Sequence, residues 1–154
     1  MPWGYCDANY AEDSHDWKST SGYTCMFVGG TISWKSKRQA SVSLSNTDVE
    51  YHALGITCQE VVWIKQFCQE LLMPLNNPIH IYLYNTAAIA LSNNPVFHNR
   101  SKHIDIWWHF VRDLIHSKII FTSHIPRTQN GMDFLTKALS WPEHEHCIKL
   151  LGME

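Results

Sequence analysis

The spacing of the apolar residues changes near Asn46, and this change constrains the fold more than any other feature of the sequence. Before it, aromatic and apolar residues gather in three short runs, at 4–8, 21–28 and 31–35. Gly29-Gly30 separates the last two runs, and a glycine pair between two such runs predicts a β-hairpin. We therefore expect three strands in this part of the chain.

After Asn46 the apolar residues follow a helical period. Six of them are spaced by three or four positions: Leu54, Cys58, Val61, Ile64, Cys68 and Leu71. Such spacing predicts one apolar face on a long helix. Thr47-Asp48-Val49-Glu50 has the form of a capping box at its start, and Pro74 ends it. Val42–Leu44, just upstream, is expected to add a further short strand.

The remainder of the chain alternates between strand and helix patterns. We expect strands at 79–83 and 119–125, and helices at about 85–92, 102–117, 128–139 and 142–151. Strands followed by strand–helix units predict an α/β fold, a mixed sheet flanked by helices. Neither an internal repeat nor a linker divides the 154 residues, so we expect a single domain over 1–154. Its core should span about 4–140, with a C-terminal helix at about 142–151.

Composition excludes several classes of protein. A net charge of -2 does not suit binding to nucleic acid by bulk electrostatics. No apolar run approaches the roughly 18 residues of a transmembrane helix, and no secretory leader pattern opens the chain. The five cysteines are odd in number and lack Cys-x-x-Cys spacing, which favours free thiols in a reducing compartment. We expect a cytoplasmic protein that is not secreted and has no membrane partner.

Three acids are candidates for chemistry: Asp7 in the first strand, Glu50 at the start of the long helix and Asp133 near the end of the chain. Each also has an ordinary alternative. Asp7 could face water on an edge strand, Glu50 could serve only as a helix cap, and Asp133 could lie on a solvated helix face. Carboxylates from separate elements of a mixed sheet suit a hydrolase that uses Mg²⁺ or Mn²⁺.

The segment His98–His103 is basic and precedes Trp107-Trp108. It could contact phosphates at a helix start, or it could be an ordinary solvated loop before a core helix. The histidines do not show the spacing of a zinc site, since no His-Glu-x-x-His string occurs.

Several longer strings point together to one family. They are 4–11, 18–23, 32–37, 43–51, 94–106 and 133–137. In this order they closely resemble the ribonuclease H domain at the carboxyl end of the Pol polyprotein of copia-type LTR retrotransposons, particularly those of plants. The resemblance runs from about Gly4 to Gly152. It implies a ribonuclease H-like fold with a mixed five-stranded sheet, and cleavage of the RNA strand of RNA–DNA hybrids during reverse transcription.

The resemblance also implies a metal site and its residues. Asp7, Glu50 and Asp133 match the first, second and fourth of four carboxylates that would bind Mg²⁺ or Mn²⁺ and carry catalysis. Apart from the resemblance, Arg100, Lys102 and His103 of the basic segment are the candidate contacts to nucleic acid. The implied partners are an RNA–DNA hybrid and the reverse transcriptase of the parent polyprotein, which this chain does not contain. The implied location is a virus-like particle in the cytoplasm.

The third carboxylate of the family pattern is missing. Tyr84 stands where the aspartate should end the strand at 79–83. Tyrosine is neutral near pH 7 and offers one weak ligand oxygen on a bulky ring. Asn85 is adjacent, but neighbouring strand residues point to opposite faces. We therefore expect weakened metal binding and a loss of activity of about a thousandfold or more.

Three functions stay open at this point. The chain could be an impaired ribonuclease H, a catalytically dead remnant that still binds nucleic acid, or a relic of a Pol polyprotein without function. The three retained acids and the basic loop favour the first two. Tyr84 and the absent polymerase favour the last two.

Overall fold

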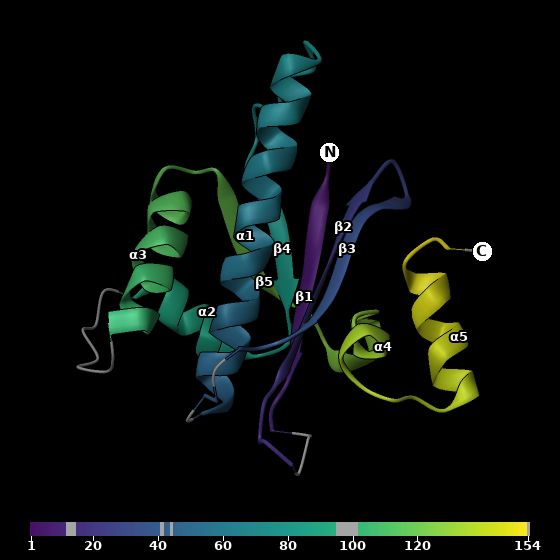
Figure 1. Ribbon diagram of the computed structural model, residues 1–154. Coiled ribbons are helices and arrows are strands. Elements are labelled where there is room, and N and C mark those ends of the chain that lie inside the picture. Colours follow the sequence, from purple (N-terminus) through teal and green to yellow (C-terminus); the bar gives the residue numbers. More distant parts are fainter. Residues whose placement is uncertain (12–14, 41, 44, 95–101, 154) are drawn as a thin grey trace.

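The computed structural model describes residues 1–11, 15–40, 42–43, 45–94 and 102–153 (Figure 1), with the backbone alone for 102–105. Its helices and strands, in chain order, are β1 (Trp3–Asn9), β2 (Thr20–Phe27), β3 (Gly30–Arg38), α1 (Asn46–Glu70), β4 (Ile79–Leu83), α2 (Thr86–Asn93), α3 (Lys102–His116), β5 (Ile120–His124), η1 (Arg127–Gln129), α4 (Asp133–Thr136) and α5 (Trp141–Leu150). None of the described helices combines the length and apolar character that crossing a membrane requires.

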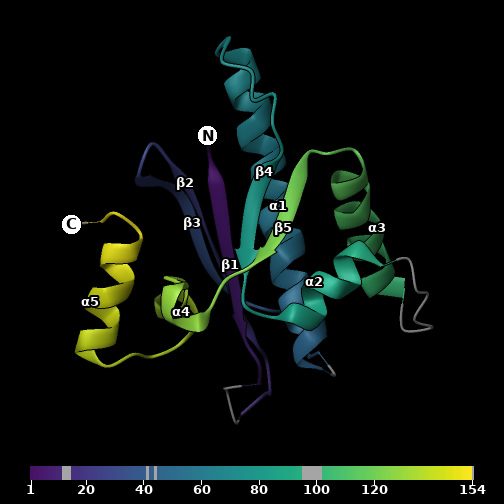
Figure 2. The same cartoon turned by 180° about the vertical axis from the view of Figure 1, so that it is seen from behind.

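The five strands form one mixed sheet in the order β3-β2-β1-β4-β5. β1, β2 and β3 pair antiparallel, whereas β4 and β5 run parallel to β1. β1 is therefore the central strand, with β2 on one side and β4 on the other (Figure 2). The prediction of a mixed five-stranded sheet flanked by helices is confirmed.

The turn between β2 and β3 lies where the glycine pair predicted it. Gly29 has a φ of +83°, a conformation that glycine adopts without steric cost. The further strand expected at Val42–Leu44 is wrong for the residues described there, because Val42 and Ser43 form no strand. The backbone N–H of Gln39 instead donates to the carbonyl of Ser19, which closes the sheet just after β3.

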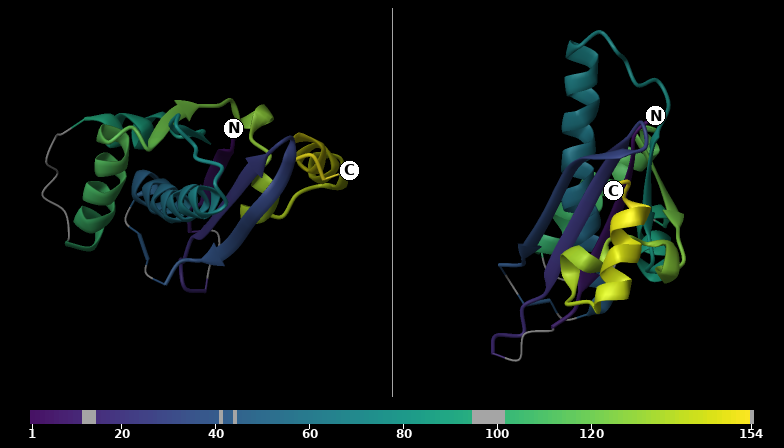
Figure 3. Two further views of the ribbon diagram at one scale, coloured as in Figure 1. Left: turned by 90° about the horizontal axis from the view of Figure 1, so that it is seen from above. Right: turned by 90° about the vertical axis from the view of Figure 1, so that its right-hand side faces the viewer.

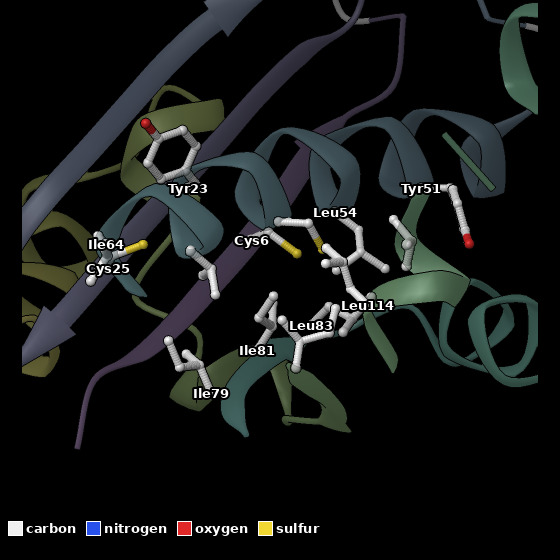
Figure 4. Close-up of a cluster of buried hydrophobic side chains, with 14 of the residues drawn as sticks. Cys6, Tyr23, Cys25, Tyr51, Leu54, Ile64, Ile79, Ile81, Leu83 and Leu114 are labelled. Carbon is white, nitrogen blue, oxygen red and sulfur yellow. The ribbon is translucent and has the colours of Figure 1, made fainter. Parts of the chain in front are cut away.

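Helix α1 covers one face of the sheet and builds the main core (Figures 3 and 4). Its apolar face meets Cys6 of β1 and Ile81 and Leu83 of β4, all fully buried. All five cysteines are free, as predicted, and all are buried, where cysteine packs as a small apolar side chain. The predicted apolar stripe is correct from Leu54 to Cys68.

The stripe is wrong at its last member. Leu71, the residue that caps the C-terminus of α1, is 53% exposed. The reason is geometric, since the C-terminal end of α1 extends past the sheet and has no strand beneath it (Figure 1). The rings of Trp63 and Phe67, also exposed, stack on each other at this end, with centroids 5.4 Å apart.

The packing of helix α3 on helix α1 depends on one close contact. Helix α3 packs against α1, and Trp107 of α3 lies against Gly55 in the middle of α1. A Cβ at position 55 would lie 2.3 Å from Cε3 of Trp107. Glycine normally weakens a helix interior by about 1 kcal/mol relative to alanine, so its presence here is explained by this contact.

We predict that Gly55→Ala destabilises the fold although alanine is the better helix former. A clash with a packed indole costs about 1–3 kcal/mol, which exceeds the propensity gain. Gly30→Ala is the matched control, because a Cβ at position 30 meets nothing within 4 Å. Urea unfolding of both variants measures the effect. Equal stability of Gly55→Ala and the unmodified chain would contradict this packing.

Candidate active site

A cleft near the carboxyl ends of β1 and β4 brings the three predicted acids together. Its volume is about 710 Å³, and Asp7, Glu50 and Asp133 all line it. Tyr84, Arg127 and Lys137 line it as well. In sheets that contain parallel strands, sites form at the carboxyl ends of those strands, so the location follows from the topology.

Asp7 is the most constrained of the acids. It lies in the central strand β1 and is only 3% exposed, so the alternative of a solvent-facing edge strand is wrong. Its direct partner across the β1–β2 pair is Gly22. A Cβ on Gly22 would lie 3.0 Å from Cγ2 of Thr136 in α4. The glycine therefore gives α4 the space to approach the Asp7 carboxylate.

The partners of Asp7 come from the far end of the chain. The Thr136 hydroxyl donates a hydrogen bond to Oδ2 of Asp7, and Nζ of Lys137 lies 3.1 Å from the same oxygen. Burial raises the pKa of Asp7. Lys137 and Thr136 oppose this rise, and the negative charge of Asp133 adds to it. The net direction is upward, so the surrounding cations do not fully compensate the buried charge.

The segment around Asp133 corrects a prediction. The single helix expected at 128–139 is replaced by η1 at Arg127–Gln129 and the one-turn α4 at Asp133–Thr136. Asn130 interrupts the helical path with an extended backbone, and its side chain accepts a hydrogen bond from the N–H of Met132. Asp133 thus begins a short helix instead of lying inside a long one.

Asp133 is held by two cations. Nζ of Lys137 lies 2.6 Å from its Oδ1, and Nε of Arg127 lies 3.2 Å from its Oδ2. The Asp133 side chain is 14% exposed, while that of Arg127 is 61% exposed. Lys137 is therefore the partner that is better shielded from solvent. The ion pair with the solvated Arg127 contributes less to stability.

Glu50 has a different local role from the one its spacing suggested. The N-cap of α1 is Ser45, whose side chain accepts from the N–H of Asp48. The Thr47–Glu50 capping box is therefore wrong, because the helix begins at Asn46. Glu50 is buried beside β1, where the backbone N–H of Ala8 donates to it.

The Glu50 carboxyl is electrostatically unsatisfied. Its Oε2 has no hydrogen-bond partner within the described part of the chain. Burial, followed by the charge of Asp7, raises its pKa to about 8. Lys137 lowers it, Asp133 raises it further, and the Ala8 hydrogen bond lowers it slightly. A buried oxygen without a partner is costly, so a cation or a water beside this oxygen would lower the free energy of the site.

Tyr84 follows β4 and lies in the same cleft. It is 48% exposed, and its ring centroid lies 6.0 Å from that of His124. The Asn85 side chain instead caps α2, because it accepts a hydrogen bond from the backbone N–H of Ala88. Asn85 is absent from the described lining of the cleft. The position where the resemblance implies a third carboxylate therefore presents a phenol to the cleft.

The residues fit a hard cation by their chemistry. Three carboxylates converge, the pKa values of Asp7 and Glu50 are raised, and one Glu50 oxygen lacks a partner. Oxygen donors of this kind are those that Mg²⁺ and Mn²⁺ prefer. In the described residues, however, no three His, Cys, Asp or Glu side chains are already gathered closely enough to hold a metal. The Lys137 ammonium lies between two of the acids.

The structure does not describe the side chains of the three residues predicted to bind nucleic acid. Arg100 lies outside the described residues, and Lys102 and His103 are described only as backbone in the first turn of α3. Their role in binding nucleic acid stays a prediction. Conversely, Gly22, Thr136 and Lys137 were not predicted as site residues. The spacing of Asp133 and Lys137 signals an ion pair, but their contact with Asp7 joins opposite ends of the chain.

Comparisons with known proteins identify similar sequences and similar folds. The chain is 39% identical over 150 residues to the "Retrovirus-related Pol polyprotein from transposon TNT 1-94" of Nicotiana tabacum, covering 97% of this chain and 11% of the relative. It is 37% identical over 149 residues to the polyprotein from transposon RE2 of Arabidopsis thaliana, covering 97% and 10%. The chain thus spans about a tenth of these relatives. No protein-family model matches.

Solved structures share the fold at low identity. The "LC11-RNase H1 in complex with RNA/DNA hybrid" has a TM-score of 0.64 at 14% identity, covering 88% of this chain and 94% of that one. The Prototype Foamy Virus Protease-Reverse Transcriptase has a TM-score of 0.53 at 13% identity, covering 99% of this chain and 20% of that one. The fold is therefore the ribonuclease H-like fold.

We predict that Glu50 makes the metal-free protein less stable as pH rises. Its folded pKa of about 8 lies above the unfolded value of about 4.3, so the folded state retains a proton that the unfolded state loses. Stability should fall between about pH 4 and 8. Glu50→Gln should flatten this fall and add on the order of 2 kcal/mol at pH 8.5.

Urea unfolding across this pH range in a chelating buffer checks the prediction. Glu145→Gln, on the exposed side of α5, is the matched control and should leave the slope unchanged. A slope as steep in Glu50→Gln as in the unmodified chain would show that another group carries it, whereas a smaller remaining slope is expected from Asp7.

Proposed function

We propose that this chain is a ribonuclease H-like domain of the retrovirus-related Pol polyprotein kind found in plant transposons. We propose further that it is of copia type and acts on the RNA strand of RNA–DNA hybrids. The observation that carries the proposal is the convergence of Asp7, Glu50 and Asp133 in one cleft. A central strand, a long helix and a one-turn helix supply one acid each, so only the folded chain creates the cluster.

The choice of substrate is supported by a structural relative and by the family. One solved relative, LC11-RNase H1, is in complex with an RNA/DNA hybrid. The cleft is open and acidic, which suits a reaction at a phosphodiester carried out with cations. We propose Arg100, Lys102 and His103 as contacts to the hybrid backbone, where phosphate contacts position the substrate without reading its sequence.

Asp7, Glu50 and Asp133 are the proposed metal ligands and catalytic residues. Bound Mg²⁺ or Mn²⁺ would supply charge stabilisation and an activated water for hydrolysis. Thr136 holds Asp7 in place through its hydrogen bond to Oδ2. Glu50 holds a proton near pH 7 in the metal-free state, because its pKa is raised to about 8. A cation beside Glu50 would favour release of that proton.

Tyr84 is proposed to impair this reaction. It brings a phenol to the cleft in place of a carboxylate, and its ring lines the space where the third acid of the family would lie. A cation would therefore find three carboxylates, one of which already pairs with Arg127. Loss of several kcal/mol of charge stabilisation corresponds to about a thousandfold in rate.

The same residue favours a second candidate function. A domain with a damaged metal site and an intact fold can still bind a hybrid without cleaving it, or it can be a relic without function. Tyr84 is the specific observation behind this alternative, since the fold and the other three acids are retained.

We further propose the reverse transcriptase of a parent Pol polyprotein as the partner. A solved relative combines protease and reverse transcriptase in one chain, of which the matched part is 20%. A cytoplasmic virus-like particle is the corresponding proposed location.

The reversion Tyr84→Asp should restore cleavage. It adds a negative charge at the end of β4 and removes the ring from the cleft. We expect the RNA strand of a hybrid to be cleaved in Mg²⁺ at least about a thousandfold faster than by the unmodified chain. Tyr84→Asn is the matched control, because it removes the ring without restoring charge, and it should gain far less.

Asp7→Asn in the revertant should abolish the gain and thereby exclude contaminating nuclease. Two outcomes would contradict the proposal. Full activity of the unmodified chain would show that Tyr84 is tolerated, and equal gains in Tyr84→Asp and Tyr84→Asn would show that charge is not what the site lacks.

Hybrid binding should depend on salt through the basic loop. Phosphate contacts release counterions, so affinity falls with rising salt. The double variant Arg100→Ala/Lys102→Ala should reduce the slope of log affinity against log salt by about one to two units. Lys149→Ala on α5 is the control of equal chemistry. Fluorescence anisotropy with a labelled hybrid measures the slope, and an unchanged slope in the double variant would show an ordinary solvated loop.

A further inference from the structure

The ammonium of Lys137 bridges two acids of the cleft. Nζ lies 3.1 Å from Oδ2 of Asp7 and 2.6 Å from Oδ1 of Asp133. The Lys137 side chain is 20% exposed, and those of Asp7 and Asp133 are 5% and 14% exposed. These are shielded, charge-assisted contacts and not a solvated surface pair.

The backbone fixes Lys137 at this point. Its N–H donates to the carbonyl of Asp133 at 2.8 Å and ends α4, after which the chain becomes extended. Thr136, its neighbour, bonds the same oxygen of Asp7. One turn of helix therefore delivers a hydroxyl and an ammonium to a carboxylate that lies about 130 positions earlier in the sequence.

The bridged oxygens are donors that a divalent ion would also need. An ion that contacts both Asp7 Oδ2 and Asp133 Oδ1 would lie in the volume of the ammonium and would be repelled by its like charge. Lys137 has a flexible four-carbon stem, so its charge can leave without unfolding α4. Glu50, with its partnerless Oε2, stays outside the bridge.

We propose that Lys137 is a tethered cation that occupies the metal position between Asp7 and Asp133, so that it stabilises the metal-free cleft and competes with divalent ions for it. This inference rests on the proposed metal-dependent function. In the metal-free state Lys137 holds Asp7 and Asp133 in position. When a divalent ion is present, the same charge lowers the affinity of the cleft for that ion. The competition reduces metal affinity more strongly in this chain, because with Tyr84 the cleft has one carboxylate fewer than the family pattern.

The test compares Mg²⁺ binding by four proteins: the unmodified chain, Lys137→Met, Lys137→Arg and Lys149→Met. Lys137→Met keeps the length of the stem and removes the charge, and we expect it to bind Mg²⁺ at least about tenfold more tightly than the unmodified chain. Lys137→Arg retains the charge and should not show this gain. Lys149→Met, on the exposed side of α5, should match the unmodified chain.

A second measurement does not use activity or metal affinity. Without metal, Lys137→Met should melt about 10 °C lower, since Asp7 loses the partner of a buried charge. Saturating Mg²⁺ should remove most of this difference. If Lys137→Met does not fold, nitrogen-15 NMR of the lysine ammonium groups of the unmodified chain decides the matter. A protected Lys137 signal should be present without metal and be lost when Mg²⁺ is added.

The outcomes separate this inference from the proposed function. Mg²⁺ binding by the unmodified chain with no gain in Lys137→Met would overturn the inference and leave the metal-dependent function standing. A Lys137 ammonium signal unchanged at saturating Mg²⁺ would do the same. An absence of Mg²⁺ binding in both proteins would overturn the proposed metal site and this inference with it.

Discussion

The burial of the Asp7 carboxylate in the central strand is the constraint on which the candidate site depends. A charge at this position must be compensated, and the chain brings α4 to it from the opposite end of the sequence. Gly22 provides the space, Thr136 a hydroxyl and Lys137 an ammonium. The compensation is incomplete, because the pKa values of Asp7 and Glu50 remain raised. Raised pKa values mean that the cleft disfavours the ionised forms of these acids, and a bound cation would favour them.

One face of β1 packs into the hydrophobic core, and the other face carries a candidate catalytic residue. Cys6 points into the core that α1 covers, while the next residue, Asp7, points to the side from which α4 approaches. Helix α1 contributes to both, since Leu54 and Cys58 fill the core and Glu50, near its start, reaches the acid cleft. A strand and a helix thus place two acids rigidly, whereas the third depends on one helical turn.

The sequence predicted the elements well wherever local pattern and tertiary packing agree. The hairpin at Gly29-Gly30 and the stripe from Leu54 to Cys68 have that property. The sequence prediction failed where a contact between distant parts of the chain determines the backbone conformation. The late helix is interrupted at Asn130, and the short α4 that follows brings Thr136 and Lys137 to Asp7. No local pattern reports a partner so distant in the chain. Likewise Thr47 suited a cap, but Ser45 caps the helix slightly earlier in the chain, which frees Glu50 for the cleft.

Crystals of the unmodified chain grown with Mn²⁺ would test the account most directly through anomalous scattering from the metal. The account predicts a single, partly occupied Mn²⁺ in the cleft beside Glu50 and Asp7, with no second ion next to Tyr84. Two fully occupied ions would contradict the claim that Tyr84 damages the site. A cleft without any anomalous peak at saturating Mn²⁺ would contradict the claim that these acids form a metal site at all.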